Sequence, residues 1–491
     1  MEGLRTPAWR SSAIDIAERV LVLLLASAIF TVHARWIFAH FSNDPYLLDS
    51  GWFAYLFESG NPLLRNPSVI NELSYYAHHL SPHIFLFGAP FRSLQGFTGV
   101  EIFAYHQGFF FALVFVSLYL MVIGGRLRRR DRTAATLAAV LIGALSNVLF
   151  QAAAYPHFEI AMFAVSSMAL AAWVSEYRRL FLLGLVWLPL IREDGGLFSA
   201  FVCIVCMALE YGSGRRDHLR KLAILAGTGV IASGGAFAIK TFFFPGFDAF
   251  TGNFAGRSWE HLSAGFMVAR LRAMFGNANI LPVLVGSAVL ATRDVRYAAG
   301  VLLLSPLYLV HLISVRPEHG SFTLYYALPW LLAWVTCLCV FVERSKTSAS
   351  SGAEALAVLV LSVTMTAPLQ AAVGVDGNSW YMPRSALERP VVDIGEVRAF
   401  ALWIRASFPT AVSDRGTSRK YCASAGMAAL IPDNLTPAEL LDPRGNPSEC
   451  RTILLLRDEM YYDVLSTRAA AHKFKVVAKR LNAELWFRDA D

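Results

Sequence analysis

The chain is dominated by apolar runs, each close in length to the thickness of a lipid bilayer. A helix that crosses the hydrocarbon core needs roughly 20 mainly apolar residues, and such runs recur as far as about residue 374. Only 16% of the 491 residues are charged, whereas a soluble domain carries about 25%. The chain therefore cannot present an ordinary aqueous surface, and we predict an α-helical polytopic membrane protein.

We predict about eleven transmembrane helices. They cover residues 18–38, 99–123, 133–151, 159–175, 180–191, 196–211, 222–243, 279–292, 297–314, 325–342 and 354–374. They form a transmembrane domain, 1–374, with a large first loop at 40–98. The polar remainder, 375–491, has a mixed α/β pattern and is predicted to be a second, small domain.

Basic residues concentrate in short loops between the apolar runs. The net charge is +7, and the strongest cluster is the segment Arg126-Leu127-Arg128-Arg129-Arg130-Asp131-Arg132. Loops of this kind face the cytoplasm. The basic residues therefore indicate how the helices are oriented in the membrane, and they do not indicate a nucleic-acid partner. Counting eleven spans, we expect a cytoplasmic N-terminus and an extracytoplasmic C-terminal domain.

The six cysteines divide into two groups. Four lie inside apolar runs, where they are expected to pack as small apolar side chains. Cys422 and Cys450 lie in the polar domain. They can form a disulfide if that domain is extracytoplasmic, because disulfides persist in oxidising compartments.

The first loop on the predicted extracytoplasmic side carries Asp49, in Leu47-Leu48-Asp49-Ser50-Gly51. A carboxylate at this place could act as a general base on an acceptor hydroxyl. The alternative, favoured by spacing alone, is that Asp49 or Ser50 caps a helix over 51–58. Further along, His78, His79 and His83 invite a metal site. Their spacing matches no closed zinc site, and an aromatic interfacial segment is the simpler interpretation.

The segment Arg192-Glu193-Asp194 lies between two short apolar runs. Ionisable groups at a membrane boundary are costly unless they are paired or face water. Arg192 could bind phosphate through its planar fork, and the two acids could hold a metal or orient the arginine. An internal salt bridge that closes a short hairpin is an equally good interpretation.

Other polar groups fall on the same predicted side, among them His157 with Glu159, and Arg316 with Glu318 and His319. Because these loops fall on the same predicted side of the membrane, together they favour one common site more strongly than any single loop does. The chain has no Gly-rich phosphate loop, no paired-aspartate motif of nucleotide-sugar enzymes and no nucleophile elbow. A nucleotide donor is therefore not expected.

The order of these motifs resembles that of a prokaryotic membrane protein family, the domain of unknown function 2079. Its members carry an aspartate motif after the first span, then a His-Phe-Ser-Pro motif, a turn with His, Pro and Glu, a basic-Glu-Asp motif and a Tyr-Pro start to a late span. The matching segments here are 49–53, 79–82, 156–159, 192–195 and 325–329, and the likeness covers roughly residues 40–435. Ala54 and Tyr55 stand where the family has Asp and Gln.

The family looks like a branch of the GT-C glycosyltransferases. The resemblance implies a GT-C-like fold in the bacterial plasma (inner) membrane and transfer of a sugar from a polyprenyl-phosphate carrier to an unknown extracytoplasmic acceptor. It implies that Asp49 takes the acceptor proton and that Arg192 and Arg316 neutralise the leaving phosphate. The remaining candidates, which would position these groups, bind substrate or hold a divalent metal, are Glu193, Asp194, His79, His157, Glu159, Tyr325 and Tyr326.

Two further functions stay open. A transporter or flippase would need ionisable residues along a water-filled path at mid-membrane depth, whereas the predicted charges gather near one face. A non-enzymatic membrane scaffold would tolerate loss of Asp49 and Arg192.

Overall fold

A computed structural model covers the whole chain. The residues that it describes are 13–43, 47–61, 75–94, 97–125, 127–211, 216–245, 259–347, 349–374, 403, 420–424, 439–441, 447–457, 462–480 and 483–488.

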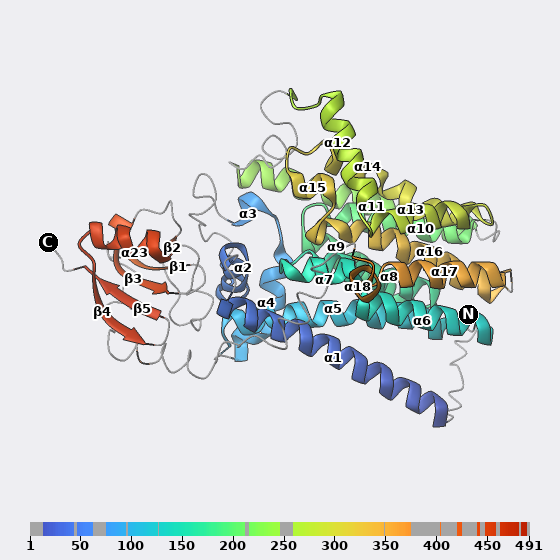
Figure 1. Ribbon diagram of the computed structural model, residues 1–491, viewed down its shortest axis with the longest axis horizontal. Coiled ribbons are helices and arrows are strands. Elements are labelled where there is room, and N and C mark those ends of the chain that lie inside the picture. The colour runs from blue at the N-terminus through green and yellow to red at the C-terminus, as the bar shows by residue number, and fades with distance from the viewer. Residues whose placement is uncertain are drawn as a thin grey trace.

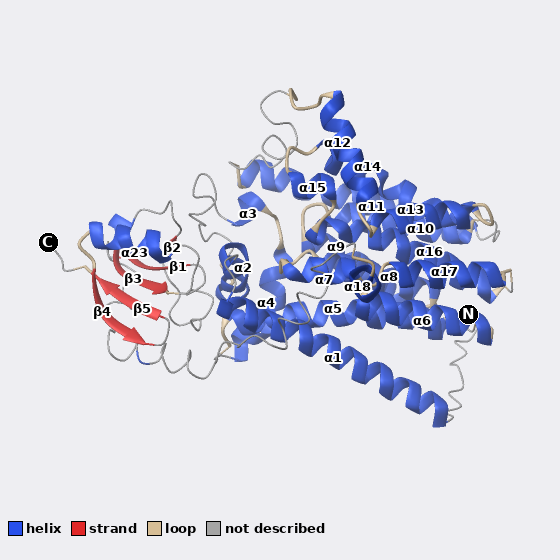
Figure 2. Ribbon diagram, viewed as in Figure 1, coloured by secondary structure: helices blue, strands red, loops and turns tan. Residues whose placement is uncertain are grey.

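The described part is mostly helical, with strands confined to the C-terminal region (Figure 2). The helices are α1 (Ala13–Asn43), α2 (Leu47–Ser59), α3 (Tyr75–His78), α4 (Pro82–Leu94), α5 (Gly99–Gly124), α6 (Arg129–Leu145), α7 (Asn147–Ala154), α8 (Ile160–Val174), α9 (Arg178–Ile191), α10 (Gly195–Glu210), α11 (Arg216–Phe243), α12 (Ala264–Gly276), α13 (Ile280–Ala291), η2 (Val295–Ala298), α14 (Ala299–Ile313), α15 (Pro317–Ser321), η3 (Leu324–Ala327), α16 (Leu328–Lys346), α17 (Gly352–Thr364), α18 (Ala367–Ala372) and α23 (Tyr462–Ala471).

The helical body has two distinct ends. The long helices run along its length, and the C-terminal sheet lies beyond the end that carries α2 and α3 (Figure 1). We call this the sheet end. The opposite end carries the start of α6 and the connection from α16 to α17 (Figure 1), and we call it the Arg-rich end.

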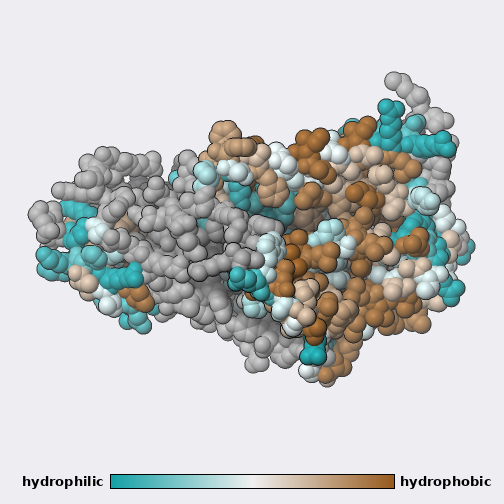
Figure 3. Space-filling model, turned by 90° about the horizontal axis from the view of Figure 1, so that it is seen from above, coloured by the Kyte–Doolittle hydropathy of each residue, from teal (hydrophilic) through white to brown (hydrophobic). Residues whose placement is uncertain are grey.

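Within the described residues, five helices are long and apolar enough to cross a membrane. They are Ile16–Ala39, Gly99–Gly124, Arg216–Phe243, Val295–Ile313 and His319–Lys346, and a sixth span results if the pair α12 and α13, bent by 77°, counts as one. On the face shown in Figure 3, apolar residues cover much of the helical body, and hydrophilic residues gather at the end away from the sheet. The protein is thus a helical membrane protein, while eleven crossings remain a prediction.

Two helices form the centre of the body. In α16, nearly every residue from Leu328 to Val342 is buried, and α5 is buried on most of its faces. Thr98 and Glu101 form a capping box that fixes where α5 begins, since each side chain satisfies a backbone N–H of the first turn.

Helices α10 and α11 approach each other through glycine. A Cβ atom placed on Gly196 would lie 2.2 Å from the carbonyl oxygen of Gly229. Membrane helices often pack through small residues, because these allow the backbones to come close. Leu197 N also donates to Ser233 Oγ at 3.1 Å across the same contact.

Ion pairs hold the Arg-rich end together. Arg344 lies 2.7 Å from Asp294 and 2.8 Å from Glu354, and therefore links the end of α16 to η2 and α17. Hydrogen bonds from Arg296 and Arg344 lower the pKa of Asp294 to about 2. The basic residues used to predict orientation thus also form specific structural contacts.

Breaks between neighbouring helices meet at a buried cluster of amides, which we call the amide triad: Asn147, Asn279 and Gln370. Asn147 Nδ2 donates to Gln370 Oε1 at 2.6 Å, and Gln370 Nε2 donates to Asn279 Oδ1 at 3.0 Å. The backbone of Asn147 also donates to Met365 O at 3.0 Å. The triad joins the breaks between α6 and α7, α12 and α13, and α17 and α18. Helix interruptions inside a membrane need such polar partners.

The described strands form a five-stranded sheet with the order β2-β1-β3-β5-β4. The strands are β1 (Lys420–Ser424), β2 (Glu439–Leu441), β3 (Cys450–Leu456), β4 (Lys475–Arg480) and β5 (Ala483–Phe487). β2, β1 and β3 are parallel, whereas β5 is antiparallel to both β3 and β4. This arrangement agrees with the mixed α/β character predicted for the C-terminal region.

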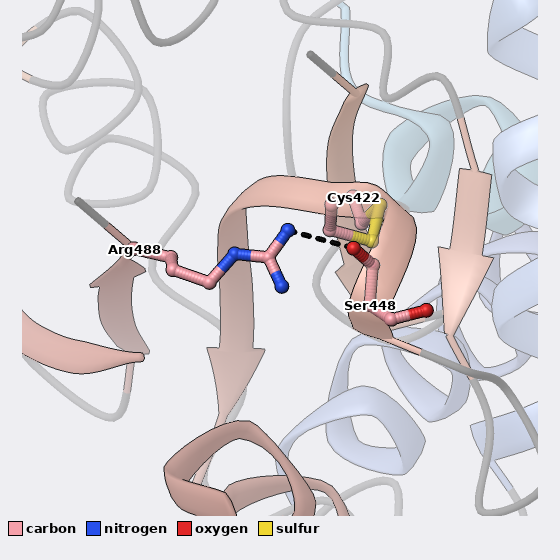
Figure 4. Close-up of a disulfide and its surroundings, with 4 residues drawn as sticks. Cys422, Ser448 and Arg488 are labelled. Carbon is pink, nitrogen blue, oxygen red and sulfur yellow. Dashed lines mark hydrogen bonds between the residues drawn. A yellow bond between two sulfur atoms is a disulfide. The ribbon is translucent and has the colours of Figure 1, made fainter. Parts of the chain in front are cut away.

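Cys422 and Cys450, for which the sequence left a disulfide possible, are joined, and the bond connects the adjacent strands β1 and β3 (Figure 4). Beside it, Arg488 donates to the carbonyl oxygen of Ser448 at 2.6 Å (Figure 4). The other four cysteines are buried and free, as predicted.

We expect a maleimide to add to four of the six cysteines in the denatured, unreduced protein and to all six after reduction, because only Cys422 and Cys450 are joined. Mass spectrometry of protein isolated from membranes measures the number of adducts. Six adducts without reduction would show that the bond does not form in the cell.

Replacement of Gln370 by Leu should lower the free energy of unfolding by about 1–3 kcal/mol, because buried polar groups lose their partners. Denaturant unfolding in detergent micelles measures this change. The Asn147→Leu/Gln370→Leu double variant should lose less than the sum of the single losses, since residues in one network couple. Strict additivity would show that the amides do not act together.

Candidate functional site

The turn between α9 and α10 places three ionisable side chains at the sheet end. Helix α9 ends at Ile191, Arg192 is extended, and α10 begins at Gly195. The N–H of Gly195 donates to Arg192 O at 2.8 Å, which closes the turn. A Cβ atom at position 195 would lie 1.9 Å from Leu188 O, so only glycine fits this close approach.

Arg192 is bound by carboxylates from both sides. Its Nε lies 2.7 Å from Asp194 Oδ1, its Nη2 pairs with Asp194 Oδ2, and its Nη1 pairs with Glu159 Oε1. The side chains of Arg192 and Glu159 are 22% and 10% exposed. A guanidinium that has lost most of its contact with water is stable only when it is compensated in this way. The salt bridge predicted as one interpretation of this turn therefore exists, and it extends to a second loop.

Glu193 points to a different set of partners. Its Oε1 lies 3.3 Å from His79 Nδ1 and 3.2 Å from Lys240 Nζ, while its Oε2 accepts from the N–H of Leu80 at 3.0 Å. Burial alone would raise the pKa of Glu193, but His79, Lys240 and Arg192 outweigh it and hold this pKa well below 4.5. Through Glu193, the turn thus binds both the end of α11 and the segment between α3 and α4.

The turn from α7 to α8 brings His157 and Glu159 to the same place. Gln107, on α5, donates to His157 O at 2.9 Å. His157 Nδ1 contacts Glu159 Oε2. The His157 ring lies against Phe53 of α2, at 4.4 Å between centroids, and stacks on Tyr325, at 4.6 Å.

A buried chain of ring nitrogens lies next to this turn. Trp187 Nε1 donates to His83 Nδ1 at 3.0 Å, so that nitrogen carries no proton. His83 Nε2 must then be the donor to His106 Nε2, 2.9 Å away, because neutral imidazole has one donor and one acceptor nitrogen. Trp187, His83 and His106 therefore pair through their facing nitrogens in a buried packing network.

A cavity of about 70 Å³ opens beside Arg192, and we call it the Arg192 cavity. Its polar lining is Glu159, Arg192, His311, Tyr325 and Tyr326. The remaining lining side chains are apolar and come from α8, α10, α14 and α16. The hydroxyl groups of Tyr325 and Tyr326 lie 2.8 Å apart.

A separate apolar groove of about 680 Å³ lies between α1, α4, α5 and α9. Phenylalanine and aliphatic side chains make up most of its walls, and His83 and Trp187 also line it. His83 is hydrogen-bonded to His106 on α5, and Gln107, the next residue of α5, donates to His157 O in the turn before α8.

The structure thus brings together most of the side chains proposed from sequence: His79, His157, Glu159, Arg192, Glu193, Asp194, Tyr325 and Tyr326. Arg316 is exposed, its own N–H donates to Ser314 Oγ at 3.2 Å, and it is not among the residues that line the Arg192 cavity. Asp49 lies in α2, one turn before Phe53, and its side chain lies outside the described residues. Since α2 begins at Leu47, the expected N-cap at Asp49 or Ser50 is wrong.

Sequence reasoning missed Lys240 and His311. Lys240 is a single basic residue near the end of a long apolar helix, and a charge in that setting is a signal of a functional or paired group. His311 carries no comparable signal, since nothing in the sequence indicates that it lines a cavity. Within the described residues, no group of three or more His, Cys, Asp or Glu side chains could hold a metal ion.

No protein-family model matches the chain, and no curated protein matches it significantly. The resemblance to the domain of unknown function 2079 and to the GT-C enzymes therefore stays a prediction.

We expect Lys240→Met to lower the free energy of unfolding by about 1.5–3 kcal/mol, the usual range for a hydrogen bond to a charged group. Lys221→Met is the matched control, because Lys221 lies exposed near the other end of the same helix. Denaturant unfolding at pH 7 compares the two variants. Equal losses would show that the pair with Glu193 adds no stability.

The lowered pKa of Glu193 also predicts that the free energy of unfolding falls at acidic pH. A carboxylate whose pKa is lower in the folded state stabilises the protein above its unfolded pKa, and that stability is lost as the pH falls. Wild-type protein should lose this contribution below about pH 4.5, towards the folded pKa. Glu193→Gln should lack it, which melting temperatures between about pH 7 and pH 3 will show. Parallel pH curves for both proteins would contradict the assignment.

Proposed function

We propose that the protein is a membrane glycosyltransferase that moves a sugar from a polyprenyl-phosphate carrier to an acceptor on the extracytoplasmic side. One observation carries the proposal. Turns from three distant parts of the sequence, at 155–159, 192–194 and 325–326, meet at one cavity at the end of the body opposite the Arg-rich loops.

The reaction follows from the groups available. A base takes the proton of an acceptor hydroxyl, the acceptor oxygen bonds to the anomeric carbon, and the bond from that carbon to the phosphate oxygen breaks. The polyprenyl phosphate leaves with the electron pair, and the proton stays on the base until it passes to the phosphate or to water. Asp49 is the proposed base, because it matches the aspartate of the family motif.

The contacts of Arg192 refine its proposed role. Its Nε and both terminal nitrogens already bind Glu159 and Asp194. In the proposal it therefore orients these carboxylates, and it would meet a phosphate only by releasing one of them. Arg316, which is exposed, then becomes the better candidate to neutralise the leaving phosphate.

The apolar groove supports a lipid-linked donor. It lies among helices that carry exposed apolar side chains, such as Leu86, Phe109 and Val186. An apolar chain can replace membrane lipid there without burying polar groups. The disulfide supports the proposed side, since it joins cysteines of the domain beyond the sheet end, and disulfides persist outside the cytoplasm.

A transporter or flippase is the second candidate, and the amide triad favours it. Interrupted helices commonly form the substrate sites of secondary transporters, and breaks in the described helices meet at this triad. Reconstituted liposomes separate the two functions, because flux of the carrier without sugar transfer would support transport.

Asp49→Asn should reduce turnover at least about 100-fold, the lower range for loss of a general base. The assay measures release of polyprenyl phosphate from a labelled lipid-linked sugar by the full-length protein, with native membrane extract as the source of acceptor. Asp217→Asn is the control, because Asp217 is exposed at the start of α11. Full turnover by Asp49→Asn would remove Asp49 from the chemistry.

A further inference from the structure

The Arg192 cavity contains a polar side chain that the ion pairs do not use. His311 comes from α14, lines the cavity and is only 9% exposed. Its Nδ1 is buried and has no hydrogen-bond partner in the described part of the chain. A buried polar nitrogen without a partner costs free energy, so a ligand that draws the His311 ring towards the cavity and pairs with this nitrogen would recover that cost.

The charges around the cavity restrict what that ligand can be. Arg192 is compensated by Glu159 and Asp194, and Glu159 itself faces the cavity. An anion would meet this carboxylate at close range, and among the described residues that line the cavity no uncompensated cation would balance it. A cation would be repelled by the guanidinium of Arg192. The lining therefore favours an uncharged group.

The available partners indicate a hydroxyl. Neutral imidazole offers one donor and one acceptor nitrogen, a carboxylate only accepts, and a tyrosine hydroxyl does both. A ligand hydroxyl can likewise donate and accept, so it can pair with His311, Glu159 or the Tyr325–Tyr326 pair. The rest of the lining, including Phe163 and Leu307, is apolar and would pack against hydrocarbon.

Size sets the last limit. A water molecule needs about 10–15 Å³ of such volume, so a cavity of about 70 Å³ holds on the order of five heavy atoms. A hydroxyl on a short or branched apolar segment fits.

We propose that the Arg192 cavity binds the hydroxyl end of an uncharged, partly apolar alcohol, with His311 as a hydrogen-bond partner. This inference names the acceptor class for the proposed transfer and in that respect rests on the proposed function. The binding itself does not depend on turnover.

Saturation-transfer difference NMR on the full-length protein in detergent micelles tests the proposal, with 1,2-propanediol as the probe. We expect a saturable signal with a dissociation constant in roughly the millimolar range, as befits so small a ligand. Leu307→Trp should abolish it by filling the cavity, and His311→Leu should weaken binding at least about tenfold, the effect of losing one good hydrogen bond.

Two controls keep the result interpretable. His311→Asn retains a hydrogen-bonding side chain and should bind better than His311→Leu, and melting temperatures will show whether each variant is folded. His218→Leu changes a partly exposed histidine near the Arg-rich end and should bind as wild type does.

Absence of a saturable signal, or an equal signal from Leu307→Trp, would overturn the site. Displacement of the diol by inorganic phosphate would overturn the assignment to an uncharged ligand. Because these measurements need no lipid-linked donor, diol binding without any sugar transfer would refute the proposed function and leave the cavity's assignment intact.

Discussion

The arrangement of the sheet end depends on the compensation of one partly buried arginine, Arg192. A guanidinium taken out of water is tolerated only with carboxylates against it. Arg192 obtains one from its own turn and one from the turn before α8, and this pairing fixes the distance between α8 and the connection from α9 to α10. Glu193 then points away from Arg192 towards Lys240 and His79. One short turn therefore joins four segments of the chain.

The same pairing shapes the chemistry that we propose. Once Arg192 and Lys240 have carboxylate partners, the group does not offer a free cation to an anion, in contrast to the interpretation of Arg192 as a phosphate ligand. The cavity beside it is lined by one compensated cation, one carboxylate and neutral polar rings. Such a lining discriminates by hydrogen-bond geometry and shape more than by charge.

The sequence was sufficient to predict a helical membrane protein and the turn at 192–194 as a polar centre, and it left a disulfide between Cys422 and Cys450 possible. These predictions rest on local patterns: apolar length, charge at a boundary and cysteine outside the apolar runs. Pairing between distant residues carries no such pattern. Lys240 and Glu193 are 47 residues apart, and Asn147 and Gln370 are 223 apart. The start of α2 at Leu47 was missed because apolar residues before Asp49 extend the helix beyond the polar residue that could have capped it.

The glycine contact between α10 and α11 has a consequence for the site. Gly229 lies on α11 roughly three helical turns before Lys240, and Gly196 immediately follows the residue that opens α10. The close contact of the two backbones therefore sets the position of α11, and with it the position of the Lys240 ammonium group. A single added methyl group at this contact would push α11 outward and weaken an ion pair that it never touches. In related sequences, the size of the side chain at this helix crossing would therefore change the distance between Lys240 and Glu193, and so the strength of their ion pair.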